Sequence, residues 1–253
     1  METKRILVTA LETRSDKAIS ALFGKLKTNI DFSFPEKDKI CIMTTSALYG
    51  EGKSTIAANT AIAMAMSGKK TLLLDADMLS PSVHQFFQYI NGGGLFDAIT
   101  KREDWRRFII KAVVPNLYIM TAGKKPLNSA KLLGSKKFKS ILTDMHIEYD
   151  YVVIDTPPVL AVPDAQILSS LADGVLVVVR HGKTTIEALK NTNETIKHAN
   201  ANIIGVVIND KNVKDGSFYG YGYGYGYGKK SHKRNAKQKA ANNDGKITSG
   251  VMS

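Results

Sequence analysis

The chain has 253 residues, of which 43% are hydrophobic and 23% are charged, so it can bury a full core as one large α/β domain with appendages. A single cysteine, Cys41, excludes a disulfide framework within the chain and favours a cytoplasmic setting. The formal charge of +12 indicates an acidic partner, but much of it comes from the C-terminal segment. No apolar run is long enough to span a bilayer.

The first part of the chain predicts an amphipathic helix. Apolar residues recur at helical spacing between Ser15 and Ile30, with lysines between them. The segment Asp31–Lys39 contains a proline and is interpreted as a linker. We therefore assign residues 1–38 to an N-terminal helix and linker, followed by a domain at 39–214.

Short apolar runs separated by helical stretches follow from residue 40 onward. They lack the alternation of a half-exposed strand, so we interpret them as strands buried on both faces of a parallel sheet. The predicted strands are Ile40–Thr44, Thr71–Leu74, Leu117–Met120, Tyr151–Ile154, Val175–Val179 and Ile203–Ile208. The predicted helices lie near Ser54–Met66, Ala130–Met145, Pro163–Ser170 and Thr185–Ala199. This order predicts a doubly wound α/β fold with a mainly parallel sheet.

The segment Ala47–Thr55 has the spacing of a Walker A phosphate-binding loop, with alanine at the position of the first glycine. A strand precedes it, a helix follows it, and its two glycines permit the turn that wraps an anion. In such a loop Lys53 contacts the β- and γ-phosphates of ATP and the Ser54 hydroxyl ligates Mg²⁺. The predicted ATP-binding residues of the loop are Gly50, Glu51, Gly52, Lys53, Ser54 and Thr55. The sequence thus predicts a sheet of the P-loop NTPase type.

Three aspartates come directly after predicted strands. Asp155 precedes Thr-Pro-Pro and stands where a Walker B carboxylate reaches Mg²⁺, directly or through water. Asp75 and Asp77 follow the neighbouring strand, and carboxylates there suit metal ligation and acceptance of a proton from an attacking hydroxyl. The alternatives are a helix-capping or turn role for Asp155 and a solvated loop position for Asp77.

The apolar periodicity stops after Asp210, and Tyr219–Gly228 alternates tyrosine with glycine. Glycine at every second position raises the entropic cost of ordering, so we predict that residues 215–253 form a mobile tail with a basic end. A stacking or adhesive low-complexity segment is the alternative interpretation.

Together these motifs resemble those of the bacterial tyrosine kinases (BY-kinases) of capsule and exopolysaccharide export, which are related to MinD/ParA-type P-loop ATPases. Gly50–Thr55 matches the Walker A motif of the family, Asp75–Asp77 its Walker A′ motif, and Asp155–Pro158 its Walker B motif. Lesser matches include Pro163–Ala165 and Val179–Arg180. By analogy with the wider ATPase class, Asn209 contacts adenine.

The resemblance implies an ATP-dependent protein-tyrosine kinase, with 39–214 as its P-loop kinase domain, that phosphorylates its own tail and regulates polysaccharide synthesis and export. The implied catalytic residues are Lys53, Asp75, Asp77 and Asp155, with Asp75 or Asp77 as the proton acceptor. The implied metal ligands are Ser54, Asp75 and Asp155. The implied phosphoacceptors are Tyr219, Tyr221, Tyr223, Tyr225 and Tyr227.

The same resemblance implies partners. A transmembrane adaptor of the polysaccharide co-polymerase type would activate the kinase and bring it to the inner face of the membrane, and a tyrosine phosphatase would oppose it; nucleic acid is not expected. Ring-shaped self-assembly is tied to a glutamate and two arginines on the first helix. The matching positions here are Ala21, Gly24 and Lys27, which weakens the prediction of a homo-oligomer.

Two other functions compete with the kinase. The first is a MinD/ParA-like regulatory ATPase that binds DNA or membrane. Leu48 replaces the lysine that this class carries early in its P-loop, which counts against this function. The second is a weakly active nucleotide-dependent interaction module. It is motivated by departures from the kinase pattern at Ala21, Gly24 and Leu79.

Overall fold

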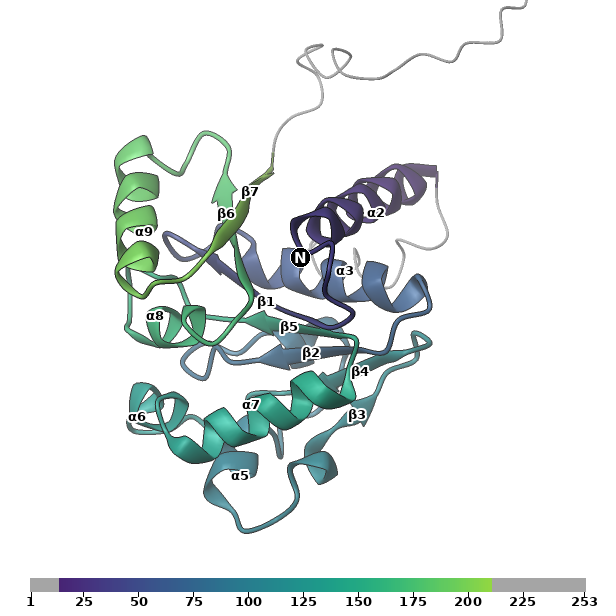
Figure 1. Ribbon diagram of the computed structural model, residues 1–253, viewed down its shortest axis with the longest axis vertical. Helices are drawn as coiled ribbons and strands as arrows, with labels where there is room; N and C mark the ends of the chain where they lie inside the picture. The colour runs from purple at the N-terminus through teal and green to yellow at the C-terminus, as the bar shows by residue number, and fades with distance from the viewer. Residues whose placement is uncertain (1–13, 211–253) are drawn as a thin grey trace, which may run out of the picture. The chain divides into compact units, whose positions relative to one another are not determined.

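The computed structural model describes residues 14–210, with side chains from residue 19 onward. Its centre is a seven-stranded sheet in the order β3-β4-β2-β5-β1-β6-β7, parallel except for the β3–β4 pair (Figure 1). The strands are β1 (Ile40–Ser46), β2 (Thr71–Asp75), β3 (Ile110–Lys111), β4 (Leu117–Met120), β5 (Tyr151–Asp155), β6 (Gly174–Arg180) and β7 (Ile203–Asn209). The predicted doubly wound, mainly parallel fold is confirmed.

Helices cover both faces of the sheet (Figure 1). The helices are α2 (Arg14–Ser33), α3 (Lys53–Met66), α4 (Val83–Phe86), α5 (Leu95–Thr100), α6 (Ser129–Leu133), α7 (Lys136–Glu148), α8 (Asp164–Ser169) and α9 (Ile186–His198), with a 3-10 helix η2 (Trp105–Phe108). The helices α2 and α3 pack on one face, and α5, α7, α8 and α9 contribute to the core of the other. Between residues 14 and 210, no helix is long and apolar enough to cross a membrane.

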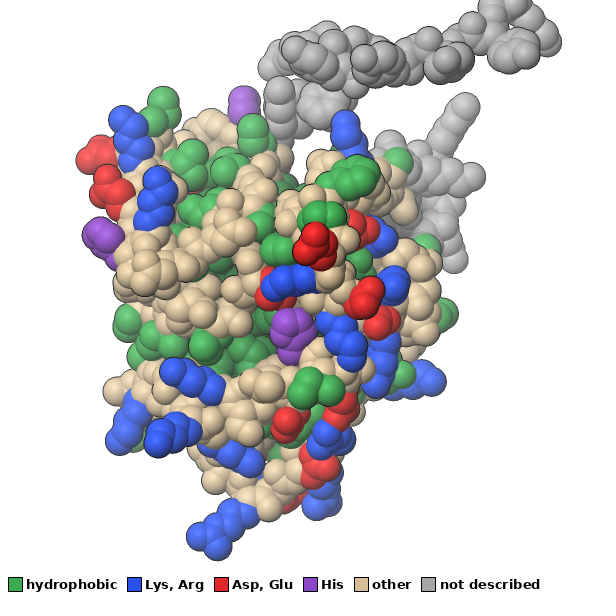
Figure 2. Space-filling view, in the orientation of Figure 1, with side chains coloured by type: hydrophobic (Ala, Val, Ile, Leu, Met, Phe, Trp, Pro, Cys, Tyr) green, Lys and Arg blue, Asp and Glu red, His purple; other side chains and the backbone are tan. Residues whose placement is uncertain are grey.

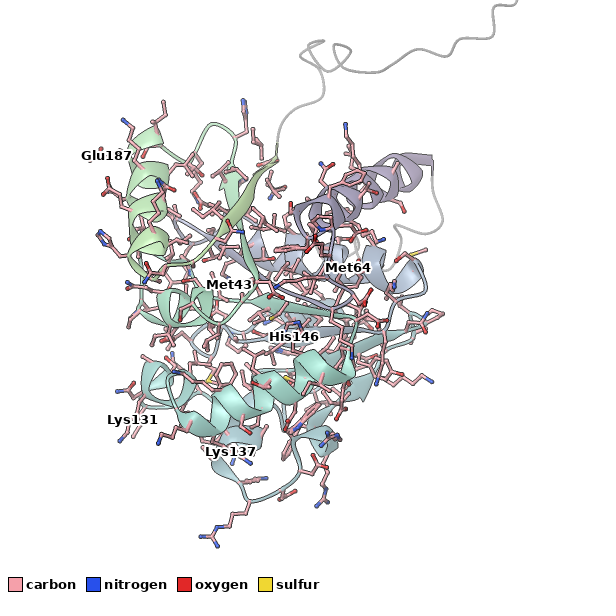
Figure 3. The ribbon with its side chains drawn as sticks, in the orientation of Figure 1. Met43, Met64, Lys131, Lys137, His146 and Glu187 are labelled. Carbon is pink, nitrogen blue, oxygen red and sulfur yellow. The ribbon has the colours of Figure 1, made fainter. Side chains whose placement is uncertain are left out.

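Alternate residues of the central strand serve the two cores. In β1, Cys41 and Met43 belong to the core under α7 and α8, whereas Ile40 and Ile42 belong to the core under α2 and α3. All four are at most 2% exposed. Figure 3 shows Met43 on the sheet and Met64 on α3, one from each of these cores. Burial on both faces is the reason that the strand is apolar throughout.

The structure corrects three details of the sequence prediction. The predicted helix near 130–145 is two helices, because Gly134 ends α6 and the Ser135 hydroxyl caps α7 by accepting from the Phe138 amide at 3.2 Å. The strand β7 lies at the edge of the sheet, and Val206 and Ile208 are 47% and 59% exposed, so it is not buried on both faces. The two-residue strand β3 was not predicted.

The helix α2 is part of the described fold. It extends through Ser33, three residues into the predicted linker, and buries Ile30 to 1% exposure in the core that it shares with α3. The Tyr151 hydroxyl of β5 donates a hydrogen bond to Asp31 Oδ1 at 2.5 Å, which fixes the end of the helix on the sheet. The boundaries 1–38, 39–214 and 215–253 stay predictions.

Positive charge gathers over α6 and α7 (Figure 2). Residues 123–143 contain six lysines and no acidic residue, and all six lysines are exposed. They are Lys124, Lys125, Lys131, Lys136, Lys137 and Lys139. Lys131 and Lys137 project from these helices in Figure 3. We call this surface the lysine strip, and it shows that the positive charge is not confined to the C-terminal segment.

Candidate functional site

The phosphate-binding loop connects β1 to α3 at the carboxyl edge of the sheet. Gly50 and Gly52 have φ of +74° and +93°, in the left-handed region that favours glycine. A Cβ atom on Gly52 would lie 2.1 Å from Asn209 Nδ2, so the loop also needs glycine for space. No side chain caps α3, and within residues 14–210 the amides of residues 50–52 donate no hydrogen bond to the protein. These free amides at a helix N-terminus suit an anion.

Lys53 begins α3 and points at the aspartates. Its Nζ forms an ion pair with Asp77 Oδ2 at 2.9 Å and donates to Ser54 Oγ at 3.2 Å. The Lys53 side chain is 13% exposed and that of Asp77 is 1% exposed. Burial lowers the pKa of Lys53, but Asp155 and Asp77 outweigh burial and leave that pKa above its usual value. The ammonium group therefore stays charged.

Asp155 ends β5 and is fully buried. It lies in register with Asp75 of β2 on one side and with Thr44 of β1 on the other. Neither carboxylate oxygen has a hydrogen-bond partner in the described part of the chain. Burial raises the pKa of Asp155 to about 6, although Lys53 opposes this shift. The nearby Ser54 hydroxyl favours the ionised form of Asp155 and so also lowers that pKa. A buried carboxylate with free oxygens is suited to a cation.

Asp75 has a different environment, because its oxygens already accept hydrogen bonds from backbone amides. Oδ1 accepts from Asp77 N at 3.2 Å, and Oδ2 accepts from Ser82 N at 3.2 Å and Val83 N at 3.1 Å. Burial, followed by the charge of Asp155, raises the pKa of Asp75 well above its usual value. Asp75 therefore anchors the loop that carries Asp77 and leads into α4.

The Asp77 carboxylate is held from two sides. Its Oδ1 accepts from the Ser80 amide at 2.9 Å, while Oδ2 faces Lys53. A fourth acid, Asp164 at the start of α8, lies close enough to Asp77 that the two charges interact. Burial raises the pKa of Asp164, and the Ser129 hydroxyl donates to its Oδ2 at 2.5 Å. Sequence reasoning gave Asp164 no role; the available signal was an acid that follows a proline at the start of a predicted helix.

The charges of this cluster fit a divalent metal. Three buried carboxylates face one buried ammonium, which leaves an excess of negative charge that a metal ion would compensate. Within residues 14–210, no three His, Cys, Asp or Glu side chains form a ready-made metal cage. A metal here would therefore take further ligands from Ser54 and from phosphate oxygens. The assignment of Ser54, Asp75 and Asp155 as ligands stays a prediction.

The remaining predicted ATP-binding residues lie in or beside the phosphate-binding loop, whereas the predicted phosphoacceptors are not described. Asn209, at the end of β7, lies against the loop and donates from Nδ2 to Glu51 O at 3.0 Å; its contact with adenine stays a prediction. The Glu51 carboxylate is buried and accepts from Leu48 N at 3.0 Å; its part in ATP binding stays a prediction. Thr55 follows Ser54 in α3. The five predicted phosphoacceptor tyrosines, Tyr219–Tyr227, lie outside the described residues.

A glycine loop between a buried strand and a helix, with carboxylates at the ends of two adjoining strands, defines a P-loop nucleotide-binding protein that works with a divalent metal. Residues 39–208 match the family model described as AAA domain. The tyrosine-protein kinase YwqD of Bacillus subtilis is 39% identical over 202 residues, which cover 80% of this chain and 85% of YwqD.

Solved structures agree with this relationship. The chimerical protein CapA2B2 has a TM-score of 0.74 at 32% identity, with 82% of this chain and 90% of that one covered. The septum site-determining protein MinD of Pyrococcus horikoshii, solved with Mg-ADP, has a TM-score of 0.58 at 20% identity, with 67% and 70% covered, and supports the fold alone. The chain belongs to the bacterial tyrosine-protein kinase family. Its activity class is the transfer of phosphate from a nucleotide to protein tyrosine.

Proposed function

We propose that the chain is an ATP-dependent tyrosine kinase that phosphorylates its own C-terminal tyrosine cluster and thereby regulates capsular or exopolysaccharide synthesis and export. The observation that carries the proposal is the buried set of Lys53, Asp77 and Asp155 beside a phosphate-binding loop, in a chain that also contains the Tyr-Gly repeat. ATP is the phosphoryl donor and Mg²⁺ the metal.

The Lys53–Asp77 ion pair supports an exchange of partners on nucleotide binding. Lys53 is the group that contacts the β- and γ-phosphates in a P-loop, yet its Nζ lies 2.9 Å from Asp77 Oδ2. Phosphate oxygens compete with that carboxylate for the ammonium group. When Lys53 turns to the phosphates, Asp77 Oδ2 loses its partner and becomes available.

The released carboxylate is the proposed proton acceptor. A free phenol ionises near pH 10, so tyrosine needs a base to attack phosphorus at neutral pH. Asp75 is less suited, because three backbone amides occupy its oxygens. The oxygens of Asp155 have no hydrogen-bond partner among the described residues, and Asp155 lies beside Asp75 in the sheet, which favours Asp155, with the nearby Ser54, as a direct metal ligand. Bound Mg²⁺ would neutralise charge on the transferred phosphoryl group.

The acceptor tyrosines, the adaptor and the phosphatase rest on the sequence and on the family. Each phosphate would add about −1.5 to −2 charges to a segment rich in lysine. An adaptor with a transmembrane part would bring the kinase to the inner face of the membrane and complete its site. Self-association remains part of the proposal only as a route by which one chain's tail could reach a neighbouring site.

The test is intact-mass spectrometry of the full chain after incubation with Mg-ATP, with and without the cytoplasmic segment of a candidate adaptor. Lys53→Met serves as the inactive control. We expect added phosphates that map to Tyr219–Tyr227 and that are absent from the control. Unmodified tyrosines in every condition would refute autophosphorylation, and ATP-dependent dimerisation instead would favour the MinD/ParA-type alternative.

A second variant tests the base. Asp77→Asn should lower the rate of phosphorylation by about 10²- to 10⁴-fold, the usual contribution of a general base. ATP affinity should stay the same or increase, because Lys53 is no longer held by a carboxylate. A variant that loses ATP binding instead would show that Asp77 serves binding and would remove it as the base.

A further inference from the structure

A negatively charged side chain is buried inside the phosphate-binding loop. Glu51 is 0% exposed, its Oε2 accepts from Leu48 N at 3.0 Å, and its Oε1 accepts from the hydroxyl of Thr184. Both oxygens are therefore committed to the protein. A carboxylate at this position repels the phosphates of a nucleotide, so its presence requires a benefit that exceeds the repulsion.

The partner hydroxyl comes from the turn between β6 and α9. Thr184 Oγ1 accepts from the Arg180 amide at 2.8 Å, and the Thr184 amide donates to Arg180 O at 3.0 Å. The Thr184 hydroxyl oxygen thus accepts from the Arg180 amide, and its own proton is donated to Glu51 Oε1. These two hydrogen bonds to the Arg180 backbone hold the turn without any contribution from the phosphate-binding loop.

The same turn contacts the phosphate-binding loop at two further carbonyl groups. Arg180 Nη1 lies 3.4 Å from Gly50 O, and Lys183 Nζ lies 3.4 Å from Tyr49 O. On the other side, Asn209 Nδ2 donates to Glu51 O at 3.0 Å. The loop is therefore held from the ends of β6 and β7, and the held segment includes Gly50, whose φ is +74°.

We propose that Glu51 and Thr184 are positioning residues that hold the phosphate-binding loop in the conformation that presents its amides to ATP. Glu51 accepts hydrogen bonds for this purpose and does not contact the nucleotide through its carboxylate. The inference rests on the proposed ATP-binding function and deepens it. It assigns to the β6–α9 turn a part in ATP affinity.

The test compares four variants of the full chain. Thr184→Val removes the hydroxyl and keeps the shape, Thr184→Ser restores a hydroxyl, and Glu51→Gln removes the charge and one acceptor. Thr185→Val is the matched control, because the neighbouring hydroxyl accepts from Ala188 N at 3.1 Å and caps α9 without contacting the loop. Mg-ATP affinity is measured by titration calorimetry, KM for ATP and kcat by phosphorylation, and Tm by thermal unfolding.

We expect Thr184→Val to weaken ATP binding and raise KM by about tenfold or more, as for loss of a hydrogen bond to a charged group, with kcat at saturating ATP changed less than KM. Thr184→Ser should recover most of the affinity. Glu51→Gln should also bind ATP more weakly, because its NH₂ group cannot accept the Leu48 or Thr184 proton. Thr184→Val and Thr185→Val should have comparable Tm values.

Tighter ATP binding by Glu51→Gln would overturn the proposal, because it would show that charge repulsion outweighs positioning. Equal affinity of Thr184→Val and Thr185→Val would overturn it as well. If Thr184→Val does not fold, the direction in which Glu51→Gln changes ATP affinity still tests the proposal. Calorimetry measures ATP affinity whether or not the tyrosines become phosphorylated. If the variants show the expected ATP affinities but the parent chain adds no phosphate, the proposed kinase function is contradicted and the positioning role is not.

Discussion

At the scale of single residues, the site contains side chains whose environment costs stability in the absence of ligand. Asp155 is fully buried, and neither of its oxygens has a hydrogen-bond partner among the described residues. Burial raises its pKa to about 6, which means that the folded protein disfavours the ionised form. Such a cost persists where function requires the group.

Asp155→Asn should therefore affect stability and function in opposite directions. We expect the variant without nucleotide to have a Tm several degrees higher than the parent chain at neutral pH, because a buried charge that Lys53 compensates only in part has been removed. The stabilisation that Mg-ATP confers on the parent chain should be largely lost. Differential scanning calorimetry with and without Mg-ATP measures both effects, and a lower Tm for the ligand-free variant would contradict this account.

Alanine substitutions at two glycines should distinguish the cost of backbone strain from the cost of a steric clash. Gly52 and Gly68 both have left-handed φ, of +93° and +88°, but a Cβ on Gly68 meets no atom within 4 Å. Gly68→Ala should cost about 1–2 kcal/mol of stability and leave ATP affinity unchanged. Gly52→Ala should also displace Asn209 and abolish ATP binding. Chemical denaturation and titration calorimetry measure the pair, and equal loss of affinity in both would refute the argument from space.

At the scale of elements, the C-terminal half of α2 packs against the core that it shares with α3. Ile30 is 1% exposed, the Tyr151 hydroxyl binds Asp31, and Lys27 forms an ion pair with Asp31 at 2.7 Å. Leu22, earlier on the same helix, is 56% exposed. The helix is therefore anchored at one end, while its earlier part presents apolar surface.

Substitutions at the two positions should differ in cost. Ile30→Ala should lower the free energy of unfolding by about 2–5 kcal/mol, because it opens a cavity between α2 and α3. Leu22→Ala should change it by no more than about 0.5 kcal/mol. Urea denaturation of both variants measures the difference, and a similar cost at both positions would mean that α2 is not anchored as described.

The elements that sequence reasoning identified are those whose signal is local. All six predicted strands are present within two residues, because the central ones are buried on both faces and so are apolar throughout. The edge position of β7 was not predictable, because strand order depends on contacts between distant segments. The break at Gly134–Ser135 had a local signal, a glycine followed by a capping serine, that the apolar periodicity obscured.

The same distinction applies to the site. The loop and the three aspartates follow from motif spacing, and the structure brings them together. The division of labour among Asp75, Asp77 and Asp155 does not follow from sequence, because it depends on which oxygens backbone amides occupy. The contribution of Thr184 was not visible either, because 133 residues separate it from Glu51.

At the scale of the whole molecule, two stretches of the chain have a clear excess of basic over acidic residues. The lysine strip lies on the fold, and residues 211–253 contain nine basic residues and two acidic ones. Phosphorylation of the Tyr-Gly repeat would act on the second group only. At about −1.5 to −2 charges per phosphate, five phosphates would offset the net charge of that segment.

Binding to a cation exchanger should therefore decrease in steps with each phosphate and stop at a residual level. Phosphorylated chain should elute at lower salt than unmodified chain, while the lysine strip maintains some retention. Charge reversal by Lys131→Glu and Lys137→Glu should lower that residual retention further. Lys53→Met incubated with Mg-ATP should elute unchanged, and identical elution of modified and unmodified parent chain would contradict the expectation.

The last described residue, Asp210, is tied to the nucleotide edge. Arg180 Nε and Nη2 contact its Oδ2 at 2.8 and 2.7 Å, and Arg180, the last residue of β6, also lies 3.4 Å from Gly50 O in the phosphate-binding loop. This has a practical consequence for deletion experiments. A shortened protein that ends at Asn209 would lose the tyrosines and the anchor of Arg180 together, and weaker ATP binding would be mistaken for an effect of the tyrosines. A chain cut after Asp210 keeps this anchor and removes the tyrosines together with the basic residues of 211–253.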